Sequence, residues 1–203
     1  MSAGPLNPQE PQIPILPKEL LLRAYSNGIF PMAMHDGEIG WFSPDPRAIL
    51  PLDSAHWPHG LRRTLKKNLF EIRYNTAFEK VLLGCAAREE TWIDPVIFRS
   101  YVALHHDGHA HSVECWQNNK LVGGLYGVQV GGVFCGESMF HTATDASKVA
   151  LHALVTRLVE RQFHLLDVQW STSHLQTFGV IEISREEYMR RLKEALLLSR
   201  RFP

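Results

Sequence analysis

The chain has 203 residues, 45% of them hydrophobic, so it can bury a sizeable core as one domain or as a domain with a small accessory unit. Its 21 Lys and Arg residues balance 21 Asp and Glu residues, so no overall field attracts nucleic acid and any such contact needs a local patch. The sequence shows neither a signal peptide nor a continuous apolar run of about 18 residues. We therefore expect a cytoplasmic protein with no membrane span.

The N-terminal quarter is predicted to contain an arm, a helix and a hairpin. Residues 1–17 hold five of the twelve prolines, which favours an extended, poorly ordered arm. A helical run over 18–25 should stop at Asn27 and Gly28, a usual helix terminator. Over 37–52, turn residues alternate with apolar ones, which predicts a small hairpin whose loop is SPDP.

A basic amphipathic helix is predicted to start near His59. Its leucines recur at intervals of four, and its cations crowd the opposite face. The cations are Arg62, Arg63, Lys66 and Lys67. Such a face is usually just solvated, but four cations in six residues without an acid also suit a phosphate grip.

The remaining elements indicate the fold class. The segments expected as strands are 70–75, 111–117, 120–130, 133–140 and 164–170. The segments expected as helices are 77–88, 94–108, 145–162 and 185–197. The three central strands are predicted to form an antiparallel meander, with tight turns at Asn118-Asn119 and Gly131-Gly132. A mixed sheet with helices on its faces, of the α+β class, is expected from this order.

Two neighbouring strands carry glycines and an acid where apolar residues would be usual. Glycine inside a strand marks either a bulge or a close approach by a ligand, and the sequence leaves both open. The glycines are Gly123, Gly124, Gly127 and Gly136. Glu137 follows in an otherwise apolar strand, where a carboxylate needs a partner. That partner is either a structural cation or a substrate hydroxyl or amine.

The segment HLLDVQW (164–170) holds a second unusual pair. It reads as a strand that is buried on both sides, yet it contains Asp167 and Gln169. Residues two apart in a strand project from the same face, so these side chains should lie side by side. Periodicity shows only that such a pair needs a reason; Gly136 and Glu137 of the neighbouring strand, taken with the resemblance given below, suggest that this face looks into a reaction cleft.

Cysteines and histidines are weaker candidates. Cys135 could be a nucleophile beside a histidine, but a free cysteine is more often a small core residue, and the same holds for Cys85 and Cys115. Four histidines cluster at the end of a helix without the spacing of a standard ligand set, so no metal is expected. They are His105, His106, His109 and His111.

Six long strings carry a resemblance to a known family. They are AYSNGIFPM (24–32), WFSPDPRAILP (41–51), TWIDPVIFRSYVALHHDGHAHSVECW (91–116), LVGGLYGVQVGGVFCGESMF (121–140), DASKVAL (145–151) and LLDVQ (165–169). They resemble the leucyl/phenylalanyl-tRNA-protein transferases over nearly all of the chain beyond residue 20. The resemblance implies a small N-terminal domain at 1–53 and a domain at 54–203 similar to the GNAT acyltransferase fold.

The implied activity is transfer of Leu or Phe, and less well Met, from aminoacyl-tRNA to the N-terminal Arg or Lys of a protein. The modified protein would enter an N-degron degradation route, and no metal or cofactor is implied. By resemblance, the Gln169 carbonyl orients the acceptor amine and helps to take its proton, with Asp167 assisting. The cationic helix face would hold tRNA.

The resemblance also assigns binding residues. Trp41 and Trp92 match contacts to the terminal adenosine, and Tyr101 and Glu137 match residues near the ester and the acceptor. The positions that match the amino-acid pocket are Leu125, Phe134, Met139, Leu151, Leu154 and Leu166. After DVQ the family usually has an Asn-containing or Asp-containing stretch, whereas this chain has WSTSH and lacks an amide at Thr172.

Two rival functions stay open at this point. An acyl-CoA-dependent N-acyltransferase would share the fold, but HTATDASK lacks the glycines with which a backbone loop cradles phosphates. A non-catalytic binder of tRNA ends or of N-terminal peptides would bind stoichiometrically, without turnover.

Overall fold

The computed structural model describes residues 14–88 and 90–203, so most of the predicted arm lies outside the described residues. The helices are α1 (Lys18–Ser26), α2 (His59–Lys66), α3 (Phe78–Ala86), α4 (Pro95–His106), α5 (Ala146–Glu160), α6 (Ser173–Gln176) and α7 (Arg185–Leu196). The strands are β1 (Phe30–Ala33), β2 (Ile39–Phe42), β3 (Arg47–Ile49), β4 (Glu71–Tyr74), β5 (Ala110–Gln117), β6 (Lys120–Val130), β7 (Val133–His141), β8 (Leu165–Gln169) and β9 (Ile181–Ile183).

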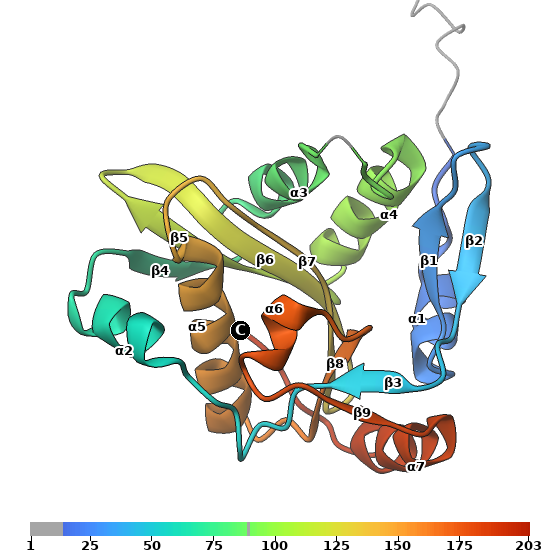
Figure 1. Cartoon of the computed structure of the whole chain (residues 1–203). Helices are drawn as coiled ribbons and strands as arrows, with labels where there is room; N and C mark the ends of the chain where they lie inside the picture. The colour runs from blue at the N-terminus through green and yellow to red at the C-terminus, as the bar shows by residue number, and fades with distance from the viewer. Residues whose placement is uncertain (1–13, 89) are drawn as a thin grey trace, which may run out of the picture.

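Seven strands form one mixed sheet in the order β4-β5-β6-β7-β8-β3-β9, while β1 and β2 form a separate hairpin (Figure 1). β7 and β8 pair in parallel, and the other neighbours in the sheet pair antiparallel. The α+β class predicted from the sequence is confirmed. Among the described helices, none is long and apolar enough to cross a membrane.

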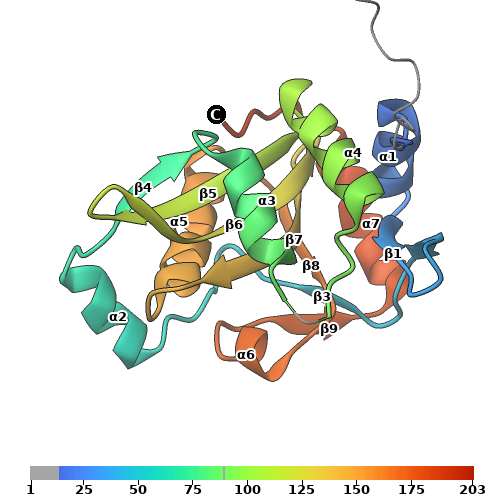
Figure 2. The same ribbon diagram turned by 90° about the horizontal axis from the view of Figure 1, so that it is seen from above.

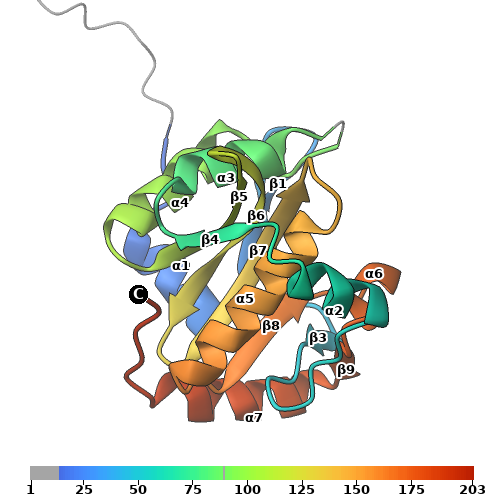
Figure 3. The ribbon, with the colours of Figure 1, turned by 90° about the vertical axis from the view of Figure 1, so that its left-hand side faces the viewer.

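Helices cover both faces of the sheet. α5 packs on one face, and α3 and α4 pack on the other (Figures 2 and 3). Because successive strand residues point to opposite faces, Phe134 joins the apolar cluster of α5 while Cys135 joins the cluster of α1, α3, α4 and α7. Burial on both sides explains why the central strands are apolar almost throughout.

Several predicted elements are confirmed with their boundary signals. α1 ends next to Gly28, whose φ is +70°. α4 begins at Pro95, and the Asp94 carboxylate accepts the Ile97 N–H at 2.7 Å. The meander of β5, β6 and β7 turns at Asn118 and Asn119, whose φ values of 51° and 59° suit a two-residue hairpin.

The predicted hairpin around SPDP is wrong. β2 pairs with β1, whereas β3, on the other side of SPDP, lies in the large sheet between β8 and β9. Alternating apolar residues predict a strand but cannot identify its partner, and β3 is attached by the buried contact of Arg47 with Asp167. β3 precedes residue 53, so the large sheet includes part of the segment that the sequence assigns to a small domain. The division at residue 53 stays a prediction.

The C-terminal residues are built into the core. The Phe202 side chain is fully buried against the rings of Phe134 and His111. The Phe202 N–H donates to Gln129 Oε1 at 3.0 Å, and Arg157 Nε donates to the Phe202 carbonyl at 3.1 Å. The last residues therefore fasten β6 and α5 together.

Candidate active site

The candidate site opens where two parallel strands part. β7 and β8 pair from Val133 with Leu165 to Cys135 with Asp167, and the pairing ends there. β7 then continues along β6 and β8 along β3, so a space opens between them. The space contains two hollows of about 90 and 340 Å³, which we name the inner and the outer hollow. Both are lined by Glu137, Ser138, Met139, Val168 and Leu175.

The inner hollow is apolar. The predicted amino-acid pocket residues that line it are Leu125, Met139, Leu151, Leu154 and Leu166. They come from β6, β7, α5 and β8, so four elements distant in the sequence converge on one space. Phe134 was predicted with them but lies elsewhere, because its side chain is fully buried in the core against Phe202.

A β-bulge places Glu137 at this opening. Tyr126 pairs with Ser138 and Gly127 pairs with Gly136, so Glu137 is the extra residue. A Cβ atom on Gly127 would lie 2.3 Å from the Cys135 carbonyl oxygen, which requires glycine there. The bulge interpretation of the strand glycines therefore holds at Gly127, whereas Gly136 lines the inner hollow.

The Glu137 carboxylate is held by hydroxyl and amide donors. The Tyr25 hydroxyl donates to Oε1 at 2.8 Å, and Gln169 Nε2 donates to the same oxygen at 3.1 Å. The Tyr101 hydroxyl lies 3.4 Å from Oε2 and hydrogen-bonds the Tyr25 hydroxyl. Burial raises the pKa of Glu137 to about 7, although these donors act in the opposite direction. No cation pairs with Glu137 among the described side chains, so the ion-pair interpretation is wrong.

A pH prediction follows from this carboxyl. Its folded pKa of about 7 lies above the ordinary value of 4.5, so the folded chain binds a proton that the unfolded chain has lost. Ionised Glu137 therefore costs stability as the pH rises through this interval. The free energy of unfolding of wild type, minus that of Glu137→Gln, is expected to fall between about pH 5 and about pH 8. Denaturant titrations at both pH values measure it.

Glu114 provides the matched control for this measurement. Burial alone would raise its pKa, but hydrogen bonds from Thr76, Ala77 and Ser112 lower it below its ordinary value. The free energy of unfolding of wild type, minus that of Glu114→Gln, should therefore change only at acidic pH. Between about pH 5 and about pH 8 this difference should stay constant. If the difference for Glu137→Gln also stayed constant over this pH range, a raised pKa of Glu137 would be contradicted.

Gln169 occupies a strained turn at the end of β8. Its φ of +66° lies in the left-handed region, which side chains other than Asn and Asp seldom adopt. The Trp170 N–H donates to the Val168 carbonyl at 2.8 Å and closes a three-residue γ-turn around Gln169. Such a conformation costs about 1–3 kcal/mol and persists only where its surroundings impose it.

Asp167 imposes this turn. Its Oδ1 accepts the Gln169 N–H at 2.9 Å and Arg47 Nε at 2.9 Å. Its Oδ2 accepts Arg47 Nη2 at 2.6 Å and the Tyr188 hydroxyl at 2.8 Å. Burial disfavours the charged guanidinium, but the Asp167 carboxylate raises the pKa of Arg47 above its ordinary value, so the guanidinium stays charged.

Asp167 and Gln169 therefore differ in what they face. Tyr188, which donates to Asp167, and Tyr25, which shares the Glu137 carboxylate with Gln169, belong to one apolar cluster on one side of the sheet. Gln169 lines the outer hollow, whereas Asp167 is fully buried and lines neither hollow. The sequence-based expectation that both look into a cleft is right for Gln169 and wrong for Asp167.

The tryptophans that line the outer hollow are not the two that were predicted to contact the adenosine. Trp92 lines this hollow, but Trp41 is 40% exposed on β2 and lies outside the lining of either hollow. Trp170, which sequence reasoning missed, does line it. Thr172, where the family usually has an amide, caps α6 by accepting the Leu175 N–H at 3.2 Å.

The other candidates lie apart from the hollows. The four cations at the basic helix α2 are all exposed: Arg62, Arg63, Lys66 and Lys67. The Cys135 thiol is buried, and burial raises its pKa, which disfavours a nucleophilic thiolate. Burial lowers the pKa of His111 to about 4, and no group of three potential metal ligands occurs within the described residues.

Comparisons with known proteins agree on one family. The model for leucyl/phenylalanyl-tRNA protein transferase matches residues 49–193, and the model for its N-terminal domain matches residues 16–45. A leucyl/phenylalanyl-tRNA–protein transferase from Gloeobacter violaceus is 52% identical over 188 residues, which cover 92% of this chain and 97% of the relative. Another, from Akkermansia muciniphila, is 53% identical and covers 89% of this chain and 96% of the relative.

One solved structure also aligns with the chain. A ribosomal-protein-alanine N-acetyltransferase from Brucella melitensis matches with a TM-score of 0.39 and 15% identity, over 51% of this chain and 81% of that chain. The membership follows from the sequence matches, which extend across both hollows and both strands of the opening. The chain belongs to the leucyl/phenylalanyl-tRNA–protein transferase family.

Proposed function

We propose that the chain transfers Leu or Phe, and less well Met, from aminoacyl-tRNA to the N-terminal Arg or Lys of proteins, which marks them for degradation. The observation that carries this proposal is the junction of the two hollows. An apolar space of amino-acid size adjoins an outer space in which Gln169 and Glu137 are hydrogen-bonded at 3.1 Å. An aminoacyl side chain in the inner hollow would bring its ester to these two groups.

The reaction is aminolysis of an ester. The acceptor α-amine attacks the carbonyl carbon, a C–N bond forms, the C–O bond to ribose breaks, and the ribose hydroxyl leaves with a proton. Gln169 Nε2 is held by the Glu137 carboxylate, so the planar amide directs Oε1 away from that carboxylate. There the carbonyl can accept an N–H of the amine and orient its lone pair.

A neutral amide is a weak base, so positioning supplies most of the rate. Holding two reactants in register can contribute about 7 kcal/mol or more to lowering the barrier. Asp167 acts as a positioning residue, because it holds the turn that aims Gln169. Glu137, whose pKa of about 7 lies near the working pH, can exchange a proton with the acceptor amine.

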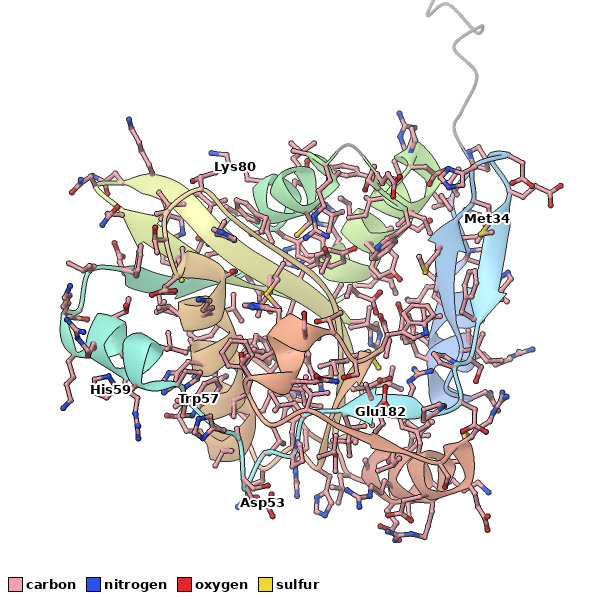
Figure 4. The ribbon with its side chains drawn as sticks, viewed as in Figure 1. Met34, Asp53, Trp57, His59, Lys80 and Glu182 are labelled. Atoms are coloured by element: carbon pink, nitrogen blue, oxygen red, sulfur yellow. The ribbon has the colours of Figure 1, made fainter. Side chains whose placement is uncertain are left out.

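The size of the inner hollow is predicted to set amino-acid preference. Met139→Phe adds a ring to its wall, so phenylalanyl transfer should fall about tenfold relative to leucyl transfer. Competition between the two charged tRNAs measures the ratio. Met34→Phe is the matched control, since Met34 is 44% exposed at the tip of the β1–β2 hairpin (Figure 4). An unchanged ratio in Met139→Phe would place the amino acid elsewhere.

The donor also needs contacts beyond the inner hollow. Trp92 lines the outer hollow and offers a face for the terminal adenosine. The exposed cations of α2 form a local positive patch on a chain without net charge, which suits the phosphates of the tRNA body. The contribution of these cations to tRNA affinity should weaken as salt is added. The contribution of the uncharged contacts in the hollows should not, so a salt titration distinguishes the two.

The test is direct transfer. Purified chain is incubated with verified, radiolabelled leucyl-tRNA and matched peptides that begin with Arg, Lys or Ala. Label should move to the Arg and Lys peptides and not to the Ala peptide, with many turnovers per chain. Absence of transfer contradicts the proposal, and binding of donor and peptide without turnover would select the non-catalytic alternative.

The acyl-CoA alternative meets an obstacle at α5. Asp145 occupies the N-cap position, where a pyrophosphate would bind helix N–H groups. Its carboxylate is fixed there by the Thr64 hydroxyl at 2.8 Å and by Lys148 Nζ at 2.7 Å. A fixed negative charge at that helix end disfavours a second anion.

A further inference from the structure

We propose that Trp170 binds the terminal adenine base of the donor and is a specificity-determining residue of the outer hollow. This inference rests on the proposed function and adds a residue to it. Trp170 lines the outer hollow with Trp92 and is 41% exposed, although a large indole is usually well buried. An aromatic ring that stays partly exposed in the lining of a hollow can stack on a base.

The indole is held in place by two phenyl rings. Its ring centroid lies 5.0 Å from that of Phe30, at an interplanar angle of 88°, and 6.1 Å from that of Phe42. Edge-to-face contacts of this kind are favourable and fix the ring orientation. Trp170 is therefore a pre-organised surface, which loses little side-chain entropy when a ligand binds.

Trp170 is also fixed relative to the proposed reaction centre. Its N–H closes the γ-turn around Gln169, so the amide and the indole project from one rigid turn. The ester and the base of an aminoacyl-adenosine are attached to the same ribose. A turn that presents Gln169 to the ester can thus present the next residue to the base.

The charges of the outer hollow favour a nucleotide over a cationic acceptor side chain at Trp170. Arg88 lines this hollow and donates to the Met139 carbonyl. A guanidinium stacked on Trp170 would be repelled by the Arg88 guanidinium, whereas a nucleotide phosphate would be attracted to it.

The test deletes the indole and the base separately. The donors are the leucyl ester of adenosine and the leucyl ester of the same ribose without a base, with an Arg peptide as acceptor. Trp170→Ala should raise the KM for the adenosine ester about tenfold and leave the KM for the base-free ester unchanged. Trp170→Phe, which keeps an aromatic face, should recover most of the loss. The KM for the Arg peptide should not change.

Three results would overturn the inference. Equal losses with both donors would show that Trp170 only supports the fold. A raised KM for the peptide would place the acceptor side chain on Trp170. An effect of Trp41→Ala confined to the adenosine ester, with none in Trp170→Ala, would assign the base to Trp41. Thermal unfolding of each variant checks folding.

Failure of the inference can be told apart from failure of the proposed function. Wild type that transfers with either donor supports the function whatever the variants do. Should wild type transfer nothing, calorimetric binding of the non-hydrolysable amide analogue of leucyl-adenosine still decides the base contact. About tenfold weaker binding to Trp170→Ala is then expected, and equal binding contradicts the inference.

Discussion

Replacing Asp167 by Ala is expected to lower the free energy of unfolding by about 3–5 kcal/mol. The substitution leaves the Arg47 guanidinium, only 1% exposed, without its two carboxylate contacts. The Tyr188 hydroxyl and the Gln169 N–H lose their acceptor as well. A buried charge without a partner is far costlier than the net gain from the intact pair. Denaturant titration measures the loss, and a change below about 1 kcal/mol would contradict it.

The paired variant Arg47→Met with Asp167→Leu separates stability from function. It removes both charges and should recover most of the lost unfolding free energy, because apolar replacements of a buried ion pair are often neutral. It does not restore an acceptor for the Gln169 N–H, so the γ-turn is no longer held. We therefore expect a stable protein with impaired transfer. Recovery of both properties would show that Asp167 has a purely structural role.

Replacing Gln169 by Gly is expected to reduce kcat for transfer about a hundredfold or more while leaving the chain at least as stable. The side chain that orients the amine is removed. The backbone φ of +66° at position 169, in contrast, suits glycine better than glutamine, so the substitution relieves strain. The opposite directions of the two effects make this the sharpest test of the site.

Gln169→Ala is the matched control for that variant. It should lose turnover equally but gain no stability from the backbone, since alanine keeps the Cβ atom that strains glutamine at positive φ. Single-turnover transfer under saturating donor, together with denaturant titration, gives both quantities. A glycine variant that keeps the wild-type rate would remove Gln169 from the mechanism.

Local signals made much of the fold predictable. Asp94 and Pro95 mark the start of α4, Gly28 marks the end of α1, and Asn118-Asn119 marks a hairpin. Each acts through neighbouring residues, so the sequence alone contains it. The short elements α6 and β9 were missed, because four and three mostly exposed residues show no usable periodicity.

The site depended on contacts that no local pattern contains. Arg47 and Asp167 are 120 residues apart, and their ion pair decides that β3 joins the large sheet and that Asp167 points away from the hollow. The turn at Gln169 has no sequence signal, since glutamine is not a usual residue at positive φ. Gly127, by contrast, lies at the bulge that presents Glu137, which is one of the two interpretations that the sequence left open for the strand glycines.

The distance along the chain between sheet partners has a consequence for synthesis of the chain. The Phe202 ring packs against His111 of β5 and Phe134 of β7, which precede it by many residues. β3 is translated early, but its partners in the sheet, β8 and β9, are translated late. Domains can otherwise begin to fold while the ribosome is still adding residues. Here β3 cannot take its place in the sheet, and the core cannot close, until β8, β9 and Phe202 have all been synthesised, so a chain that lacks these segments should be degraded rather than function.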